Sequence, residues 1–182
     1  MKNVHKILGL LVQDDLRWGS QVEYMVKKAS KKIWLLRRMR NLGVDEYTVA
    51  AYWKGEGLCH LEYCSPVWSS ALTKQQQQDL ARVHRRAVAA ISGTYARGEE
   101  FEEICSRLGL EADLGRRRLR LAQRFAERTA ENSRHQDMFL RLENPPNTRS
   151  GGRIWREPPC HTQRHLHSAL PYLTRLLNGE TQ

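Results

Sequence analysis

The chain has 182 residues, of which 40% are hydrophobic and 27% are charged, and this balance excludes a wholly disordered protein. Thirty Lys and Arg against twenty Asp and Glu give a net charge of +10 and a pI near 9.8. A charge excess of this size is typical of proteins that bind a polyanion such as nucleic acid, although net charge concerns partners and not the fold.

The apolar segments and cysteines of the chain bear on its compartment. No stretch approaches the roughly 20 apolar residues that a membrane span needs. The first apolar run, residues 7–12, is too short for a signal peptide and is followed by two aspartates. The four cysteines are irregularly spaced, so we expect reduced, mostly buried thiols. These features predict a nuclear or cytoplasmic protein that is not secreted and has no membrane partner.

Residues 4–12 (VHKILGLLV) have the pattern of one short apolar strand with a glycine inside it. A lone strand must pair with another, and no clear partner follows in the sequence. We therefore interpret residues 1–19 as a strand and loop from which a preceding strand has been cut away.

A helix is predicted over residues 20–41, where the apolar residues recur with a period of 3.6. Ser20 and Glu23 can form a capping box at its start, and Gly43 can end it. One face of this helix is apolar and comprises Val22, Val26, Ala29, Ile33 and Leu36. The opposite face is basic and comprises Lys27, Lys31 and Arg38, flanked by Lys28 and Lys32.

A second helix is predicted after Asp45, where Val49, Tyr52 and Trp53 form its apolar side. Gly55 and Gly57 predict a break in this helix because glycine disfavours helical backbone. A short helix then resumes and stops at a proline, and residues 58–66 make up this segment.

The third helix has the clearest signals. Thr73 and Gln76 form a capping box, and Gly93 supplies the stop. His84 lies on the apolar face, which favours a packed core histidine over a catalytic base. The opposite face carries Arg82, Arg85 and Arg86.

Two more helices are predicted, over residues 99–108 and 114–132, and Arg118 falls on the apolar face of the second. Residues 143–182 contain Pro-Pro and Gly-Gly steps that cannot extend a helix, and they end in a short amphipathic segment at 168–178. The predicted fold is mainly α: a small helical bundle with a short N-terminal strand and an extended Pro/Gly-containing C-terminal tail. The predicted helical domain covers residues 20–142.

Metal binding is weakly indicated. Cys59, His60 and Cys64 lie close together, but their spacing does not match the paired ligands of structural zinc sites. The other possible ligands, Cys160 and His161, lie about a hundred residues away in the tail. We expect no metal and no cofactor.

Catalytic signatures are also weak. The sequence contains neither phosphate-binding glycine motif of nucleotide-binding proteins. Asp14 and Asp15 are the only adjacent aspartates, and we interpret them as a turn and not as part of a two-metal site. No histidine is singled out as a base for a cysteine nucleophile. We expect no catalytic residues and no enzymatic activity.

The basic helix faces carry the strongest functional signal. Residues 20–41 hold seven basic residues and one acid, whereas residues 45–72 hold four acids and one lysine. Aromatic residues Trp18, Tyr24 and Trp34 are interleaved with the first basic stretch and could stack on bases or belong to the core. The predicted nucleic-acid-binding residues are Lys27, Lys28, Lys31, Lys32, Arg38, Arg82, Arg85 and Arg86.

An ordered set of motifs covering residues 6–178 resembles the reverse transcriptases of jockey-like non-long-terminal-repeat retrotransposons. The matching segments include residues 6–9 (KILG), 61–68 (LEYCSPVW) and 82–87 (RVHRRA). The block at 61–68 is the most specific of these. The resemblance implies the thumb and C-terminal region of an RNA-directed DNA polymerase, without the palm and its catalytic aspartates.

This resemblance carries further expectations. Leu8 and Gly9 would belong to the strand that steadies the primer end, and the partners would be RNA, DNA or an RNA–DNA hybrid, with a palm domain in a full-length parent. The parent enzyme would need Mg²⁺ at a palm site that this chain lacks. Residues 54–60 (KGEGLCH) depart from the family, whose members carry an apolar stretch there, and this departure is typical of a copy that drifts without selection.

Two alternatives stay open. The chain could be a helical protein-interaction domain with an incidental basic surface. It could also be a degenerate, non-functional remnant of a transposable element that never folds stably.

Overall fold

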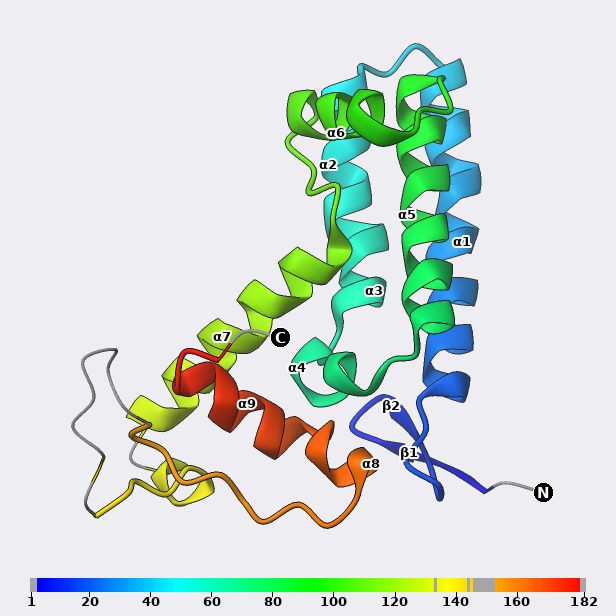
Figure 1. Ribbon diagram of the computed structural model, residues 1–182. Helices are drawn as coiled ribbons and strands as arrows, with labels where there is room; N and C mark the ends of the chain where they lie inside the picture. The colour runs from blue at the N-terminus through cyan, green and yellow to red at the C-terminus, as the bar shows by residue number, and fades with distance from the viewer. Residues whose placement is uncertain (1–2, 133, 144, 146–152, 181–182) are drawn as a thin grey trace. The chain divides into compact units, whose positions relative to one another are not determined.

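The computed structural model describes residues 3–132, 134–143, 145 and 153–180, and it is mainly helical with a two-stranded sheet near the N-terminus (Figure 1). This confirms the predicted fold class. The chain forms two compact units. The first unit comprises Met1–Cys64 and Leu72–Arg117, and the second comprises Ser65–Ala71 and Arg118–Gln182. The domain boundaries predicted from the sequence, at residues 19 and 142, stay a prediction.

The first unit begins with a hairpin. Strand β1 (Val4–Ile7) pairs antiparallel with β2 (Leu10–Gln13), with Val4 opposite Gln13 and Ile7 opposite Leu10. The prediction of a single partnerless strand over residues 4–12 is therefore wrong. The chain reverses at Leu8 and Gly9, whose φ angles are 47° and 88°. A two-residue loop with both φ angles positive matches the twist of a hairpin, and glycine supplies that conformation at little cost.

Helix α1 (Gly19–Asn41) matches the predicted helix and buries one apolar face. Its N-cap position is Trp18, and the backbone N–H of Ser20 donates to Gln13 Oε1 at 3.0 Å. The predicted cap at Ser20 is therefore wrong, because a side chain from the hairpin supplies the acceptor. Gly43, with φ 79°, follows the helix as predicted.

The second helical rod is continuous across its glycines. Helix α2 (Glu46–Tyr52) is capped by Asp45, runs into a π-helical turn η1 (Trp53–Leu58), and continues as α3 (Cys59–Glu62). The predicted break at Gly55 and Gly57 is wrong. A Cβ atom at Gly57 would lie 1.9 Å from the Trp53 ring, so the missing side chain leaves room for a buried indole.

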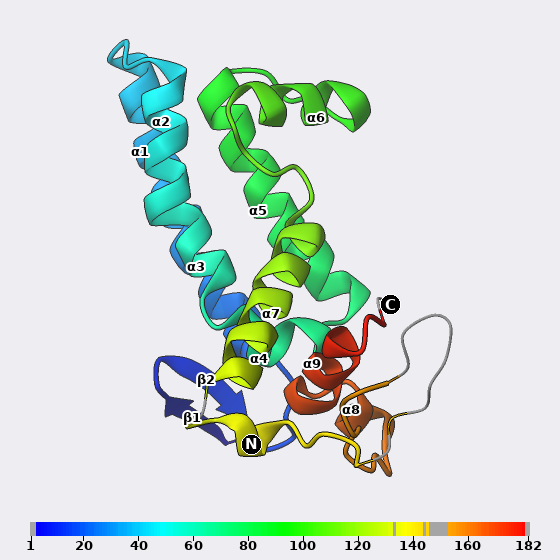
Figure 2. The same cartoon turned by 90° about the vertical axis from the view of Figure 1, so that its left-hand side faces the viewer.

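Helix α5 (Lys74–Ser92) packs along α1 and carries the predicted capping box of Thr73 and Gln76. Gly93, with φ 81°, ends it. His84 is 1% exposed, which confirms it as a core residue. Helix α6 (Gly98–Arg107) lies across the end of α5 (Figures 1 and 2).

The second unit contains two short helices, α4 (Ser65–Trp68) and η2 (Ser69–Ala71), and most of α7 (Leu114–Glu131). Its other helices are η3 (Gln136–Met138), α8 (Gln163–Leu166) and α9 (Ala169–Leu177). The last of these confirms the predicted terminal helix. The core of this unit includes a cluster of Ala122, Ala126, Phe139, Leu173 and Leu176.

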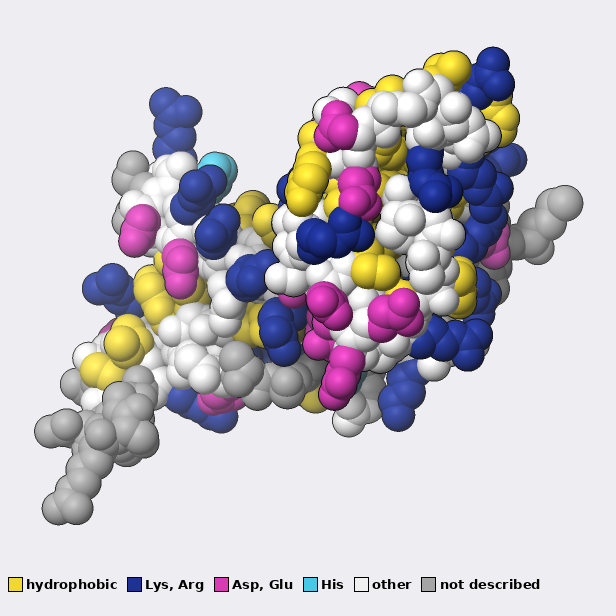
Figure 3. Space-filling model, turned by 90° about the horizontal axis from the view of Figure 1, so that it is seen from above, with side chains coloured by type: hydrophobic (Ala, Val, Ile, Leu, Met, Phe, Trp, Pro, Cys, Tyr) yellow, Lys and Arg dark blue, Asp and Glu magenta, His cyan; other side chains and the backbone are white. Residues whose placement is uncertain are grey.

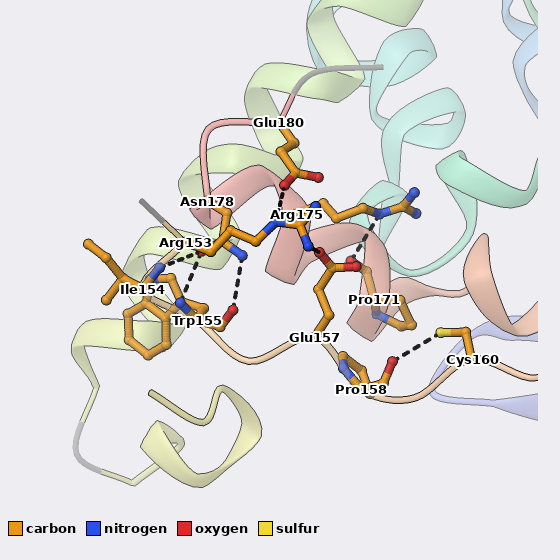
Figure 4. A network of polar contacts seen from close by, with 10 residues as sticks. All are labelled: Arg153, Ile154, Trp155, Glu157, Pro158, Cys160, Pro171, Arg175, Asn178 and Glu180. Carbon is orange, nitrogen blue, oxygen red and sulfur yellow. Dashed lines mark hydrogen bonds and ion pairs between the residues drawn. The ribbon is translucent and has the colours of Figure 1, made fainter. Parts of the chain in front are cut away.

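An asparagine fixes the extended segment that precedes α8. The Asn178 side chain accepts from the backbone N–H groups of Ile154 and Trp155 and donates to the carbonyl of Trp155 (Figure 4). Arg153 forms ion pairs with Glu157 and Glu180 in the same network. Because these contacts satisfy backbone groups that have no helical partner, the segment is ordered without regular secondary structure.

Candidate nucleic-acid interface

The outer face of α1 presents a row of exposed side chains, Lys27, Lys31, Trp34 and Arg38, which we call the α1 stripe. Their spacing of three or four residues places them one above the other on a helix. The buried face of the helix lies opposite and includes Met25, Ala29 and Leu36. The 3.6-residue period that builds the core therefore also aligns the cations outward.

The cations of the α1 stripe have no acidic partner among the residues that the structure describes. In the described part of the chain, no ion pair joins Lys27, Lys31 or Arg38 to a carboxylate. Glu23 is the single acid among the residues of α1, against seven Lys or Arg. Figure 3 shows Lys and Arg side chains along the side of the first unit where α1 lies. Like charges four residues apart cost about 0.2–0.5 kcal/mol, so the fold does not gain from this arrangement.

Lys28 and Lys32 lie farther round α1 and have neighbours within the fold. The Nζ atom of Lys28 lies 4.9 Å from the centre of the Tyr24 ring, and Lys32 Nζ lies 2.8 Å from Glu56 Oε2. The hydrogen bond to Glu56 raises the pKa of Lys32, and the same bond lowers the pKa of Glu56. Lys32 is therefore already paired, unlike the cations of the α1 stripe.

Helix α5 carries a second, shorter cationic face. The three arginines Arg82, Arg85 and Arg86 are exposed, as the sequence predicts, opposite the buried side of the helix. Arg82 NH1 lies 3.2 Å from Asp79 Oδ1. Among the described residues, Arg85 and Arg86 form no ion pair. Two neighbouring helices of the first unit thus expose unpaired cations.

The three aromatic residues that the sequence left undecided have different environments. Trp18 is 8% exposed and belongs to the core, and Tyr24 is half-buried beside Lys28. Trp34 is 68% exposed and lies between Lys31 and Arg38 on the α1 stripe. Only Trp34, among these three, presents its ring to solvent in the way that base stacking requires.

Leu8 and Gly9 form the hairpin turn and not a strand, so their predicted placement in a primer-steadying strand needs correction. Leu8 is 87% exposed, and its carbonyl oxygen accepts a hydrogen bond of 2.7 Å from Tyr63 Oη. The turn is thus attached to the residue that follows α3. Sequence periodicity could not reveal this contact, because the two residues are 55 positions apart.

The remaining candidates for metal binding or catalysis are the aspartate pair and the cysteines. Asp14 and Asp15 lie in a turn after β2, as predicted, and Asp14 Oδ1 lies within hydrogen-bond distance, 3.1 Å, of His5 Nε2. Within the described residues, no three His, Cys, Asp or Glu side chains gather in a way that could hold a metal ion. Of the four cysteines only Cys105 is buried, so the expectation of mostly buried thiols is wrong. Partial desolvation and the nearby charge of Glu56 raise the pKa of the exposed Cys59 thiol, which disfavours the reactive thiolate.

His84 is held neutral in the core of the first unit. Trp53 Nε1 donates to His84 Nδ1 at 3.2 Å, and His84 Nε2 lies 2.9 Å from the carbonyl oxygen of Glu111. Burial lowers the pKa of His84 from 6.5 to about 4. An imidazole that donates to a carbonyl and accepts from an indole is a structural link and has no free nitrogen for catalysis.

The structure also brings together residues that sequence reasoning missed. Lys6, Lys28, His60 and Tyr63 line one pocket of the first unit, although they come from the hairpin, α1 and the end of α3. No local pattern connects positions so far apart. Among the described residues, no helix combines the length and the apolar character that crossing a bilayer requires. Comparison of the chain with protein-family models, with curated proteins and with solved structures gives no match.

Proposed function

We propose that this chain binds nucleic acid without sequence preference, through the α1 stripe and the exposed arginines of α5. The observation that carries the proposal is the row of unpaired cations at Lys27, Lys31 and Arg38, with an exposed indole among them. In this proposal the chain is a thumb-like and C-terminal fragment of a retrotransposon RNA-directed DNA polymerase, present in the nucleus or cytoplasm. It contributes binding and has no catalytic centre of its own.

The dimensions of α1 suit a nucleic-acid backbone. Lys27 and Arg38 are 11 residues apart, which corresponds to about 16 Å along a helix that rises 1.5 Å per residue. One strand of a duplex places a phosphate about every 3.4 Å along its axis, so the stripe spans roughly five phosphates. Three cations at this spacing can pair with phosphates without reading base edges, which predicts affinity without specificity.

The salt dependence of binding tests this proposal. If the three stripe cations, Arg85 and Arg86 each pair with a phosphate, log affinity for an RNA–DNA hybrid should fall with log salt at a slope of about −4 to −5. Fluorescence anisotropy of a labelled hybrid between low and moderate NaCl measures this slope. An affinity that does not change over this range of salt would refute the proposal.

A charge-matched pair of variants separates a defined interface from net charge. The variant Lys27→Ala/Lys31→Ala/Arg38→Ala should lower affinity at least tenfold and make the slope shallower by about 2.7, since each lost phosphate contact accounts for about 0.9. The control Arg17→Ala/Arg107→Ala/Arg153→Ala also removes three charges, but each of these arginines is ion-paired with an acid. Equal losses in both variants would mean that only total charge matters.

The contribution of Trp34 to single-strand binding provides a second test of the proposed function. Stacking of a base on an aromatic ring contributes about 1–3 kcal/mol and requires an unpaired base. Trp34→Ala should therefore weaken binding to single strands by about tenfold and binding to a blunt duplex much less. The reverse order of losses would exclude stacking at this ring.

The two alternatives predict other outcomes. A degenerate remnant would show no cooperative thermal transition by circular dichroism. A helical protein-interaction domain would melt cooperatively and yet bind neither hybrid nor single strand. Cooperative melting together with salt-dependent binding supports the proposed function against both.

A further inference from the structure

A pocket of about 200 Å³ opens in the first unit where the hairpin meets α1 and the end of α3. Its polar lining is contributed by Lys6, Gln21, Tyr24, Lys28, His60 and Tyr63. These residues come from three elements, so the pocket exists only in the folded chain. None of the stripe residues lines it, and the pocket is therefore a feature distinct from the α1 stripe.

The pocket is electropositive. Its described lining contains two lysines, Lys6 and Lys28, and no carboxylate. The hydrogen bond from Lys28 lowers the pKa of Tyr24, and the charge of Lys6 acts in the same direction. Burial lowers the pKa of His60, and Lys28 and Lys32 lower it further. A cavity in which the existing positive charges disfavour a further cation is suited to bind an anion.

Hydrogen bonds fix the walls of the pocket across long sequence separations. Gln21 is 1% exposed, and its Oε1 accepts from the backbone N–H of Leu11 at 2.9 Å. Tyr63 Oη donates to the carbonyl of Leu8 at 2.7 Å. Both bonds attach the hairpin to a helical wall. The cations at the rim therefore have a framework that is organised before any ligand arrives.

We propose that this pocket binds a phosphate group. Lys6, Lys28 and a protonated His60 can supply charge-assisted hydrogen bonds, and Tyr24 can supply a hydroxyl donor. The phosphate could be an internal phosphodiester of nucleic acid or a terminal phosphate. The nucleic-acid source rests on the proposed function, whereas affinity for the phosphate group itself does not.

A bound phosphate would act on His60 in a defined direction. An anion near an imidazole favours the protonated form, so phosphate should raise the pKa of His60. The charged groups that already act on this imidazole are Lys28 and Lys32 from α1 and Glu56 from η1. The two lysines lower the pKa of His60, and the phosphate would oppose them.

An NMR titration of the imidazole protons in the full chain, with and without inorganic phosphate at constant ionic strength, tests the proposal. His60→Gln assigns the resonance. We expect phosphate to raise the pKa of His60 by about one unit relative to chloride. The same experiment on Lys28→Gln should show no response, whereas Lys27→Gln, on the same helix but outside the pocket, should respond as the wild type does.

Two outcomes would overturn the proposal: an unchanged pKa of His60 in phosphate, or an undiminished response in Lys28→Gln. Oligonucleotides of one sequence, with either a 5′-phosphate or a 5′-hydroxyl, then distinguish the sources. A response to the 5′-phosphate alone assigns a terminal phosphate, and a response to both assigns an internal one. If neither shifts His60 while inorganic phosphate does and stripe-dependent binding persists, nucleic acid is excluded as the source of the phosphate and the proposed function stands.

Discussion

Two helical segments of the first unit, η1 and the α1 stripe, both break ordinary sequence rules, and the structure accounts for only one of them. The η1 turn places two glycines inside a helix, which sequence rules count as destabilising. The α1 stripe exposes a tryptophan among like charges, which is also unfavourable. The glycine-containing turn η1 has a packing partner inside the fold, whereas the α1 stripe has none among the described residues.

Contacts within the core explain the η1 turn. Gly57 leaves space for the Trp53 indole, which is fully buried and donates to His84. The His84 ring stacks on the indole, with 6.2 Å between centroids, and its other nitrogen contacts the carbonyl of Glu111. This chain of contacts joins the second helical rod to α5 and to the segment before α7. Residues 54–60, whose composition was interpreted from the sequence as drift, therefore include a glycine that the packing requires.

Compensation inside the core distinguishes structural residues from candidates for binding. A residue that violates a local rule and is compensated inside the core belongs to the architecture. A residue that violates such a rule without compensation inside the fold is a candidate for a surface that binds a partner. By this criterion Gly57 is structural and the α1 stripe is the candidate for binding. Measurements of the free energy of unfolding test this distinction directly.

The largest effect is expected at Gly57. The variant Gly57→Ala places a Cβ atom 1.9 Å from the Trp53 ring and should lower the free energy of unfolding by about 2–3 kcal/mol, which is typical of overpacking. Urea denaturation followed by circular dichroism measures the change. If Gly57→Ala were as stable as the wild type, the packing explanation of η1 would be wrong.

Acidification should weaken the same core through His84. Its folded-state pKa of about 4 lies below the 6.5 of an exposed imidazole, so the unfolded state binds a proton that the folded state excludes. Stability is complete above pH 6.5 and should fall by about 2 kcal/mol between pH 7 and pH 5. Urea denaturation at both pH values measures this loss, which should shrink in His84→Gln. The contribution of His60, whose pKa is also lowered, is common to both proteins and cancels.

Gly55 provides a matched control within the same turn. A Cβ atom there would meet nothing within 4 Å, so Gly55→Ala only restricts the unfolded chain and improves helix propensity. We expect the free energy of unfolding to rise by about 0.5–1 kcal/mol, opposite in sign to the effect of Gly57→Ala. A loss of stability in the same urea measurement would show that the π-helical turn itself, and not the Trp53 contact, requires the glycines.

The smallest effect on stability is expected at the α1 stripe. The variant Lys27→Ala/Lys31→Ala/Arg38→Ala should change the free energy of unfolding by no more than about 0.5 kcal/mol, because the side chains are exposed and unpaired. The removal of like charges and the high helix propensity of alanine both favour a slight gain. A thermal melt checks this result. A loss of 2 kcal/mol or more would give the stripe a structural role and remove it as a candidate for binding.

The features that depend on local signals could be predicted from the amino-acid sequence alone. The 3.6-residue period predicted α1 and its outward cations, and the capping box of Thr73 and Gln76 with Gly93 predicted the limits of α5. The apolar face of α5 also identified His84 as a core residue. These features could be predicted because helix propensity, capping and amphipathic spacing act within a few residues.

Features whose determinants lie far apart in the chain depend on tertiary contacts and could not be predicted in this way. The hairpin turn at Leu8 is attached to Tyr63, the start of α1 is bonded by Gln13, and η1 keeps its helical path because Trp53 reaches His84. The pocket lined by Lys6, Lys28 and His60 likewise needs three elements at once. Short-range propensity cannot specify such contacts, because their free energy is gained only after the intervening chain has folded.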